Sequence, residues 1–216
     1  MKLQTLLQDV SYTIVQGFID VEIADISMNS KNEQKSNAFV CIDGATVDGH
    51  TFAKEVAQKG ATAIVVEQEM TGMEQYDITI IRVEDTKCAY AAMSAAYFGY
   101  PAKELTTIGV TGTKGKTTTT YMIWSILQYA GLKTGLIGTI ESVIGDVKIP
   151  SDNTTPEAYT LQKYLRQMVD EGCRYAVMEV SSQGLKFERT AAMIFDYGIF
   201  TNLEEDHIGP KEHADM

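Results

Sequence analysis

A short glycine- and lysine-rich segment carries the residues with the clearest capacity for chemistry. It reads Gly112-Thr113-Lys114-Gly115-Lys116-Thr117-Thr118 and follows a β-branched run, residues 107–111, that is typical of a buried strand. Apolar residues at helical spacing begin just after it. A strand, a glycine-rich turn and a helix in this order direct backbone N–H groups and the positive end of a helix dipole at one point. We therefore predict that the segment binds an anion, and a polyphosphate above all.

Each residue type in this loop has a physical role in such binding. Gly112 and Gly115 let the backbone turn tightly and approach phosphate oxygens. Lys116 can reach the β- and γ-phosphates of a nucleotide, and Thr117 can offer its hydroxyl to Mg²⁺. The loop departs from the strict pattern G-x-x-x-x-G-K-[ST], because Val110 stands where the first glycine is expected. The alternative is a glycine-rich turn that caps a helix and exposes a lysine, but the flanking strand and helix favour phosphate binding.

Three further polar clusters follow the loop, where other strands are expected to end. Residues 153–155 precede a proline and a helical stretch, an arrangement that also suits a simple helix N-cap. Glu179 ends an apolar strand and could hold Mg²⁺ with Thr117, or be an ordinary solvated carboxylate. His207 follows the last strand, where a histidine is more often a surface or capping residue. Because parallel strands end at one edge of a sheet, we expect these clusters to share one crevice.

The rest of the chain alternates β-branched runs with helical patterns. In the first half we predict strands at 22–26, 38–42, 62–66 and 78–83, and helices at 51–59 and 86–98. In the second half we predict strands at 107–111, 134–140, 175–180 and 195–201, helices at 116–130 and 157–171, and a polar loop over 141–156. The alternation predicts an α/β protein, with a mixed α/β domain followed by a mainly parallel sheet. Gly99 and Pro101 mark a linker, so the predicted domains are 1–104 and 105–216.

Composition restricts the partners. The 216 residues are 44% apolar and 22% charged, which is ordinary for a globular protein. A net charge of −11 argues against broad attraction to nucleic acid or to an anionic membrane. Cys41, Cys88 and Cys173 lie far apart without metal-ligand spacing, as expected for reduced thiols of a cytoplasmic protein. We expect a monomer that binds small molecules, with neither a nucleic acid nor a membrane as partner.

Four motifs and the first half of the chain resemble the Mur ligases. The motifs are GVTGTKGKTTTTYM (109–122), NTTPE (153–157), MEVSSQGL (178–185) and DYGIFTNLEEDH (196–207). Residues 26–67 are similar to the uridine-binding domain of the family members that add the third residue of the peptidoglycan stem peptide. Whole enzymes of the family have three domains. The resemblance therefore implies that this chain is an N-terminal piece, comprising the first domain and part of the second.

The resemblance implies an ATP-dependent amide ligase of peptidoglycan precursor synthesis. In such enzymes ATP phosphorylates the γ-carboxylate of the D-glutamate in UDP-MurNAc-L-Ala-D-Glu, and the amino group of an incoming amino acid displaces phosphate from the acyl phosphate. The implied cofactors are ATP and Mg²⁺, and the implied partners are UDP-N-acetylmuramoyl-dipeptide and an amino acid. An N-terminal piece by itself is expected to be inactive.

The resemblance also assigns residues to sites by motif. The ATP phosphates are assigned to Gly112, Thr113, Lys114, Gly115, Lys116, Thr117 and Thr118. Magnesium is assigned to Thr117, Glu179 and His207, and the catalytic roles to Lys116, Glu179 and His207. The muramoyl-dipeptide is assigned to Asn153, Thr154, Thr155, Ser181 and Arg189, and the uridine end of the substrate to Met28, Ser30, Ala45, Thr46 and Val47.

Two other functions stay open at this point. A ligase related to folylpolyglutamate synthase would share the phosphate loop, although such an enzyme begins near that loop and lacks the first half of this chain. A non-catalytic fragment that binds a UDP-sugar or a nucleotide would share all of the binding motifs.

Overall fold

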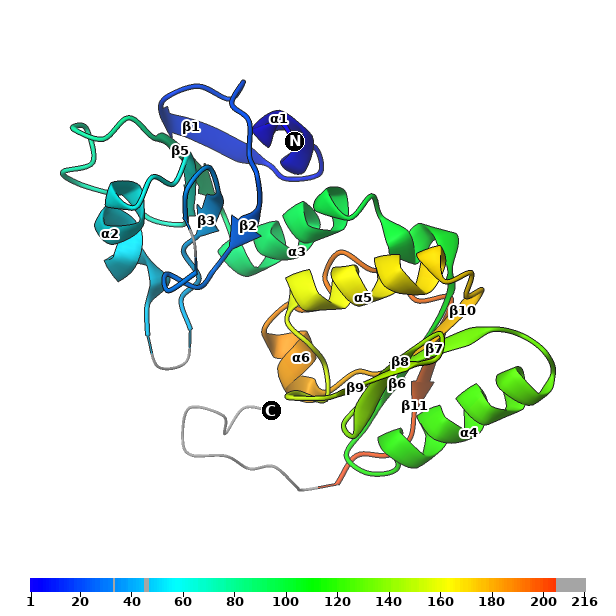
Figure 1. Cartoon of the computed structure of the whole chain (residues 1–216). Helices are drawn as coiled ribbons and strands as arrows, with labels where there is room; N and C mark the ends of the chain where they lie inside the picture. Colours follow the sequence, from blue (N-terminus) through cyan, green and yellow to red (C-terminus); the bar gives the residue numbers. More distant parts are fainter. Residues whose placement is uncertain (33, 45–46, 205–216) are drawn as a thin grey trace. The chain divides into compact units, whose positions relative to one another are not determined.

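The chain divides into two compact units, Met1–Tyr97 and Phe98–Met216, in the computed structural model (Figure 1). The structure describes residues 1–32, 34–44 and 47–204. Each unit is built on one sheet with helices packed against it, which confirms the α/β fold. The domain boundary predicted after residue 104 falls somewhat later than this division, at the end of the 3₁₀ helix η2 (Pro101–Glu104).

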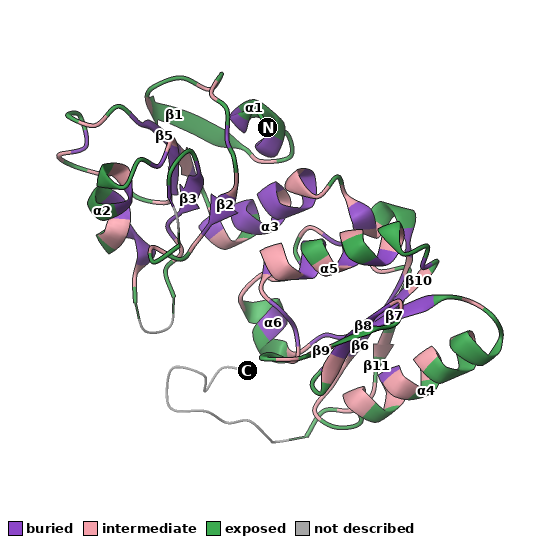
Figure 2. Ribbon diagram, in the orientation of Figure 1, coloured by how far each residue is buried: buried purple, intermediate pink, exposed green. Residues whose placement is uncertain are grey.

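The first unit contains a five-stranded sheet in the order β1-β5-β4-β3-β2. Neighbouring strands from β2 to β5 are parallel, whereas β1 runs antiparallel to β5. The strands β3 and β4 are buried along their whole length, and Figure 2 shows β3 in the colour of buried residues. The strands are β1 (Tyr12–Gln16), β2 (Ile26–Ser27), β3 (Ala38–Val40), β4 (Ala63–Val66) and β5 (Thr79–Val83), and the helices are α1 (Leu3–Leu6), η1 (Gly49–Phe52), α2 (Ala53–Gln58) and α3 (Thr86–Tyr97).

The second unit contains a six-stranded sheet in the order β11-β6-β10-β7-β8-β9. Its first four strands are parallel to one another, β8 is antiparallel to β7, and β9 is antiparallel to β8. The strands are β6 (Thr106–Thr111), β7 (Thr134–Ile137), β8 (Glu141–Ile144), β9 (Val147–Pro150), β10 (Tyr175–Glu179) and β11 (Tyr197–Phe200), and the helices after η2 are α4 (Lys116–Tyr129), α5 (Ala158–Asp170) and α6 (Ser182–Lys186). Among the described residues, no helix is long and apolar enough to cross a membrane.

Helices α4 and α5 cover opposite faces of the second sheet (Figure 1). Side chains alternate along a strand, so Val177 packs toward α4 while its neighbour Met178 packs toward α5. Trp124 of α4 packs against the apolar cluster that contains Val177, and Leu165 of α5 belongs to the cluster that contains Met178. With both faces covered, the open positions of the sheet lie at its edges and at the ends of its strands, and polar residues gather at the carboxyl ends.

Some predicted elements differ from the structure. The polar loop predicted over 141–156 is wrong in its first part, because 141–150 forms the hairpin β8–β9 around Gly145 and Asp146. A Gly-Asp pair between alternating runs is a usual hairpin signal, which the surrounding polar residues obscured. The strand predicted at 22–26 is wrong except at Ile26, and β1, α1 and α6 were not predicted. These elements are short, and β1 is in addition placed by its pairing with the distant strand β5.

The three cysteines are expected to differ sharply in reactivity. Burial raises the pKa of the Cys41 and Cys173 thiols, whereas Cys88 is exposed on α3. Because the thiolate is the nucleophile, we predict that a disulfide reagent modifies one thiol per chain at pH 8 and all three after unfolding in guanidinium. Absorbance of the released thiolate measures both values. Rapid reaction of a second thiol in the native chain would contradict the packing around Cys41 and Cys173.

Candidate functional site

The loop between β6 and α4 has the conformation that its glycines require. Gly112 has φ +131, and a Cβ atom there would lie 2.2 Å from Oγ1 of Thr201. Gly115 has φ +84 and is the N-cap of α4, where it offers no side-chain oxygen. The first-turn amides of this 14-residue helix therefore have no side-chain cap. They present N–H groups and the positive end of the helix dipole, which suits an anion.

Lys116 lies across this loop. Its Nζ donates to the carbonyl oxygens of Gly112 at 2.7 Å and Thr113 at 3.1 Å. The ammonium group is thus held at the inner side of the glycine turn, where its charge adds to that of the helix N-terminus. The structure places this predicted phosphate-binding residue beside the other residues of the loop.

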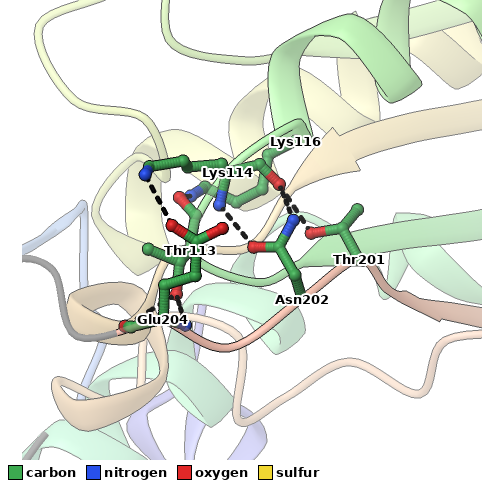
Figure 3. Close-up of polar contacts among 6 residues, drawn as sticks. All are labelled: Thr113, Lys114, Lys116, Thr201, Asn202 and Glu204. Atoms are coloured by element: carbon green, nitrogen blue, oxygen red, sulfur yellow. Dashed lines mark hydrogen bonds and ion pairs between the residues drawn. The ribbon is translucent and has the colours of Figure 1, made fainter.

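The segment that leaves β11 fastens the loop from outside (Figure 3). Oδ1 of Asn202 accepts from the Lys114 amide at 2.9 Å, and its Nδ2 donates to the Lys114 carbonyl at 3.1 Å. Oγ1 of Thr201 donates to the same carbonyl at 2.7 Å. Nζ of Lys114 lies 2.5 Å from Oε2 of Glu204. Lys114 is therefore turned toward this segment, and the loop is fixed before any ligand arrives.

Glu179 is the central buried charge of the site. It has 0% exposure at the end of β10, so the solvated strand-end alternative is wrong. Its Oε2 accepts from Oγ1 of Thr117 at 2.9 Å and from Oγ1 of Thr139 at 3.0 Å, and its Oε1 accepts from the Thr139 amide at 2.8 Å. A buried carboxylate needs such donors because it has lost its hydration. These bonds place Glu179 and the phosphate loop at one edge of the sheet.

The oxygens of Thr117 and Glu179 fit a magnesium ion in their chemistry. Both are hard donors, and their 2.9 Å separation matches adjacent ligands of an octahedral ion with bonds of about 2.0–2.1 Å. Within the described part of the chain, no three His, Cys, Asp or Glu side chains gather into a metal site. An ion held here would complete its shell with water and phosphate oxygens, as Mg²⁺ usually does. The third predicted ligand, His207, lies outside the described residues.

The segment predicted to bind the muramoyl-dipeptide packs against the other side of Glu179. Oγ1 of the buried Thr155 donates to the Glu179 carbonyl at 3.0 Å and accepts from the Ser181 amide at 2.9 Å. Nη1 of Arg189 donates to the Thr155 carbonyl at 2.9 Å, and the guanidinium also pairs with Glu157. The segment is therefore more than a helix N-cap, because Thr155 forms hydrogen bonds with the backbone at the end of β10 and at Ser181, which follows it.

One cavity of about 410 Å³ joins these elements, a volume usual for small-molecule sites. Seven predicted residues line it: Gly112, Thr113, Lys116, Asn153, Thr154, Ser181 and Arg189. Residues that were not predicted complete the wall: Thr111, Asp152, Ser182, Gln183, Leu185, Phe200, Leu203 and Glu204. Thr117, Thr155 and Glu179 do not line the cavity. Thr155 forms a hydrogen bond with the amide of Ser181, which does line it.

The remaining predicted residues are not among those that line this cavity. Lys114, Gly115 and Thr118 are exposed and do not line it. Met28, Ser30 and Val47 belong to the first unit, where the Ser30 carbonyl accepts from Nζ of Lys59 at 2.9 Å. Ala45 and Thr46 lie outside the described residues.

Thr139 is a site residue that was not predicted from the sequence. It follows Gly138 at the carboxyl end of β7, the parallel neighbour of β10. The register pairs Ile137 with Met178, so the two residues that follow β7 lie beside Glu179. A Gly-Thr pair after an apolar strand was the available signal, but the strand predicted to continue to 140 concealed it.

Comparison with known proteins agrees with this architecture. Residues 110–216 match the model of the Mur ligase middle domain, and residues 22–98 match the Mur ligase family catalytic domain. The chain belongs to the Mur ligase family. Its sequence is 44% identical over 208 residues to a UDP-N-acetylmuramoyl-L-alanyl-D-glutamate–2,6-diaminopimelate ligase of Clostridium perfringens, which covers 96% of this chain and 43% of that protein. The ligase of the same name from Bacillus licheniformis is 46% identical over 208 residues, 96% of this chain and 41% of its own length.

Solved Mur ligases share the fold. A structure of a UDP-N-acetylmuramoyl-L-alanyl-D-glutamate–2,6-diaminopimelate ligase matches 99% of this chain and 43% of its own, with a TM-score of 0.78 and 23% identity. The Thermotoga maritima MurF ligase, solved in complex with ADP, matches 85% of this chain and 38% of its own, with a TM-score of 0.54 and 24% identity. This chain thus spans less than half the length of the Mur ligases it matches.

Gly112 offers a direct test of the loop geometry. We predict that Gly112→Ala lowers the free energy of unfolding by about 1–3 kcal/mol, because its φ is strained for alanine and the new methyl group meets Thr201. The matched control is Gly198→Ala, where a Cβ meets nothing within 4 Å, and it should stay within about 0.5 kcal/mol of the parent. Urea unfolding measures both variants. Equal midpoints would show that the loop does not have this conformation.

Proposed function

We propose that this chain is the substrate-binding and ATP-binding part of an ATP-dependent amide ligase of peptidoglycan precursor synthesis. The ligase adds the third amino acid to UDP-MurNAc-L-Ala-D-Glu in the cytoplasm. The contact between Thr117 and Glu179 carries the proposal, because it joins the phosphate loop to a buried carboxylate beside a cavity of ligand size. The names of the related ligases support the reaction and favour 2,6-diaminopimelate as the amino acid.

The two domains divide the substrates between them in this proposal. Residues 105–216 hold the ATP phosphates on Lys116 and on the loop and first-turn amides of 112–118. Residues 1–104 hold the uridine end of the UDP-sugar through Met28, Ser30 and residues 45–47. Asn153, Thr154 and Arg189 line the cavity beside the loop, which supports their role in binding the muramoyl-dipeptide.

The proposed chemistry has two steps. A γ-carboxylate oxygen of the D-glutamate attacks the terminal phosphorus of ATP, and the bond between that phosphorus and ADP breaks. The amine of the amino acid then attacks the acyl carbon, a C–N bond forms, the C–O bond to phosphate breaks, and the amine loses a proton. Phosphorylation is needed because a carboxylate is a poor electrophile and has no good leaving group.

The residues of this chain contribute mainly charge and position. Lys116 and the first-turn amides of α4 stabilise the negative charge of the transferring phosphoryl group, and the fixed loop holds it in line. Thr117 and Glu179 would hold Mg²⁺ through their oxygens, and the ion would supply positive charge against the repulsion between ATP and the substrate carboxylate. Glu179 holds the Thr117 hydroxyl in place for that purpose.

Lys116 provides the test of nucleotide binding. We predict that Lys116→Ala abolishes binding of a fluorescent ATP analogue to the 216-residue chain without unfolding it, because the loop loses its one inward ammonium group. The matched control is Lys163→Ala, since Lys163 is exposed on α5 and does not line the cavity. Fluorescence titration measures binding, and circular dichroism checks the fold. If Lys116→Ala binds the analogue like the parent, the assignment of the loop is wrong.

The chain by itself is expected to bind but not to react. We predict that it makes no tripeptide product from ATP, UDP-MurNAc-L-Ala-D-Glu and diaminopimelate, because its Mur relatives are more than twice as long. Chromatography of the nucleotide-sugar measures product, and calorimetry measures binding of the UDP-sugar and of a folate. ATP-dependent product would overturn this expectation, and binding of the folate instead of the UDP-sugar would favour the folate ligase.

A further inference from the structure

Thr139 makes two separate bonds to the buried carboxylate of Glu179. Its amide donates to Oε1 at 2.8 Å, and its hydroxyl donates to Oε2 at 3.0 Å. One residue therefore contacts both carboxylate oxygens, which fixes the plane of the carboxylate as well as its position. Thr117 supplies the third donor, on Oε2. Of these donors, Thr139 alone lies outside the phosphate loop and α4.

The backbone at Gly138 makes this close approach possible. A Cβ atom at Gly138 would lie 2.5 Å from Oε1 of Glu179. Only glycine leaves room for the carboxylate to lie against the chain and accept the next amide. The pair Gly138-Thr139 is thus shaped to receive Glu179.

The Thr139 hydroxyl also reaches the substrate segment. Its oxygen lies 3.1 Å from Oγ1 of Thr154, a residue that lines the cavity. A hydroxyl has one proton, and that of Thr139 is directed to Glu179, so Thr154 donates to Thr139. A directed chain of hydrogen bonds therefore runs from Thr154 through Thr139 to Glu179, where the bond from Thr117 also ends.

We propose that Thr139 is a positioning residue that orients Glu179 for the cation of the nucleotide and couples the nucleotide loop to the Thr154 segment. The inference rests on the proposed function, since it concerns the same ATP and acceptor sites. Thr139 does not line the cavity, and it acts through the two residues that its hydroxyl contacts, Glu179 and Thr154. A cation bound to Oε2 of Glu179 weakens this oxygen as an acceptor for the Thr139 hydroxyl. The hydrogen bond between Thr139 and Thr154 changes as a result.

The hydroxyl can be removed without changing the shape of the side chain. Thr139→Val keeps the amide bond to Oε1 but loses both hydroxyl contacts, and Thr139→Ser keeps the hydroxyl. Loss of such an outer hydrogen bond commonly weakens metal binding 10–100-fold, so we expect about a tenfold rise in the half-saturating Mg²⁺ concentration for the valine variant. At saturating Mg²⁺ its affinity for the nucleotide should lie within about twofold of the parent, because the loop itself is unchanged.

The experiment titrates Mg²⁺ against a fluorescent ATP analogue bound to the 216-residue chain. The variants are Thr139→Val, Thr139→Ser and the control Thr160→Val on α5. Serine should restore the parent midpoint, and the control should leave it unchanged. A second readout is hydrogen exchange of the amides of 151–157, which the Mg²⁺–nucleotide complex should slow in the parent and serine chains but not in the valine chain.

The outcomes separate this inference from the proposed function. If the parent chain does not bind the nucleotide at any Mg²⁺ concentration, the proposed function falls, and the inference falls with it. If the parent binds and Thr139→Val has the parent midpoint, only the inference is overturned. Thr154→Val tests the coupling should the valine variant at 139 fail to fold. It should lose the exchange response while keeping the parent Mg²⁺ midpoint, and an intact response would overturn the coupling.

Discussion

The second unit depends on one constraint, the burial of the Glu179 carboxylate without loss of hydrogen bonds. A charged group that leaves water is costly unless donors replace its hydration. Here one donor is Thr117 of α4, the helix that packs on the sheet. The others belong to Thr139, which follows β7, the neighbour of β10 in the sheet. The ends of β6, β7 and β10 must therefore meet at one edge. The polar site and the apolar packing of the sheet consequently specify the same register.

The phosphate loop is preorganised by contacts on its outer side. Asn202 and Thr201 form hydrogen bonds with the backbone of Lys114. Gly112, which has no side chain, leaves room for the Thr201 hydroxyl. Lys116 meanwhile fills the inner side of the turn. A loop that is already fixed loses little conformational entropy when a ligand binds, which leaves more of the contact energy for affinity.

The site is also continuous with the segment that lines the cavity. Thr155 bonds to the backbone of Glu179 and Ser181, while Thr154 reaches the carboxylate through Thr139. A ligand on the phosphate loop and a ligand on this segment would therefore act on the same buried group from two sides. Such shared hydrogen-bond networks are the physical means by which two neighbouring sites can influence each other.

The sequence by itself determined the kinds of elements and the chemistry of the loop. Strand, glycine turn and helix at 107–130 follow from local spacing, as does the order of motifs that marks the family. Tertiary structure alone decided that Glu179 is buried, that Thr139 holds it, and that Asn202 fastens the loop. These contacts join residues 40 to 88 positions apart, and their partners are set by sheet register rather than by any local pattern. The hairpin at 141–150 differs from these contacts, because it had a local signal in Gly145-Asp146, but its strands are short and depend on their neighbours for stability.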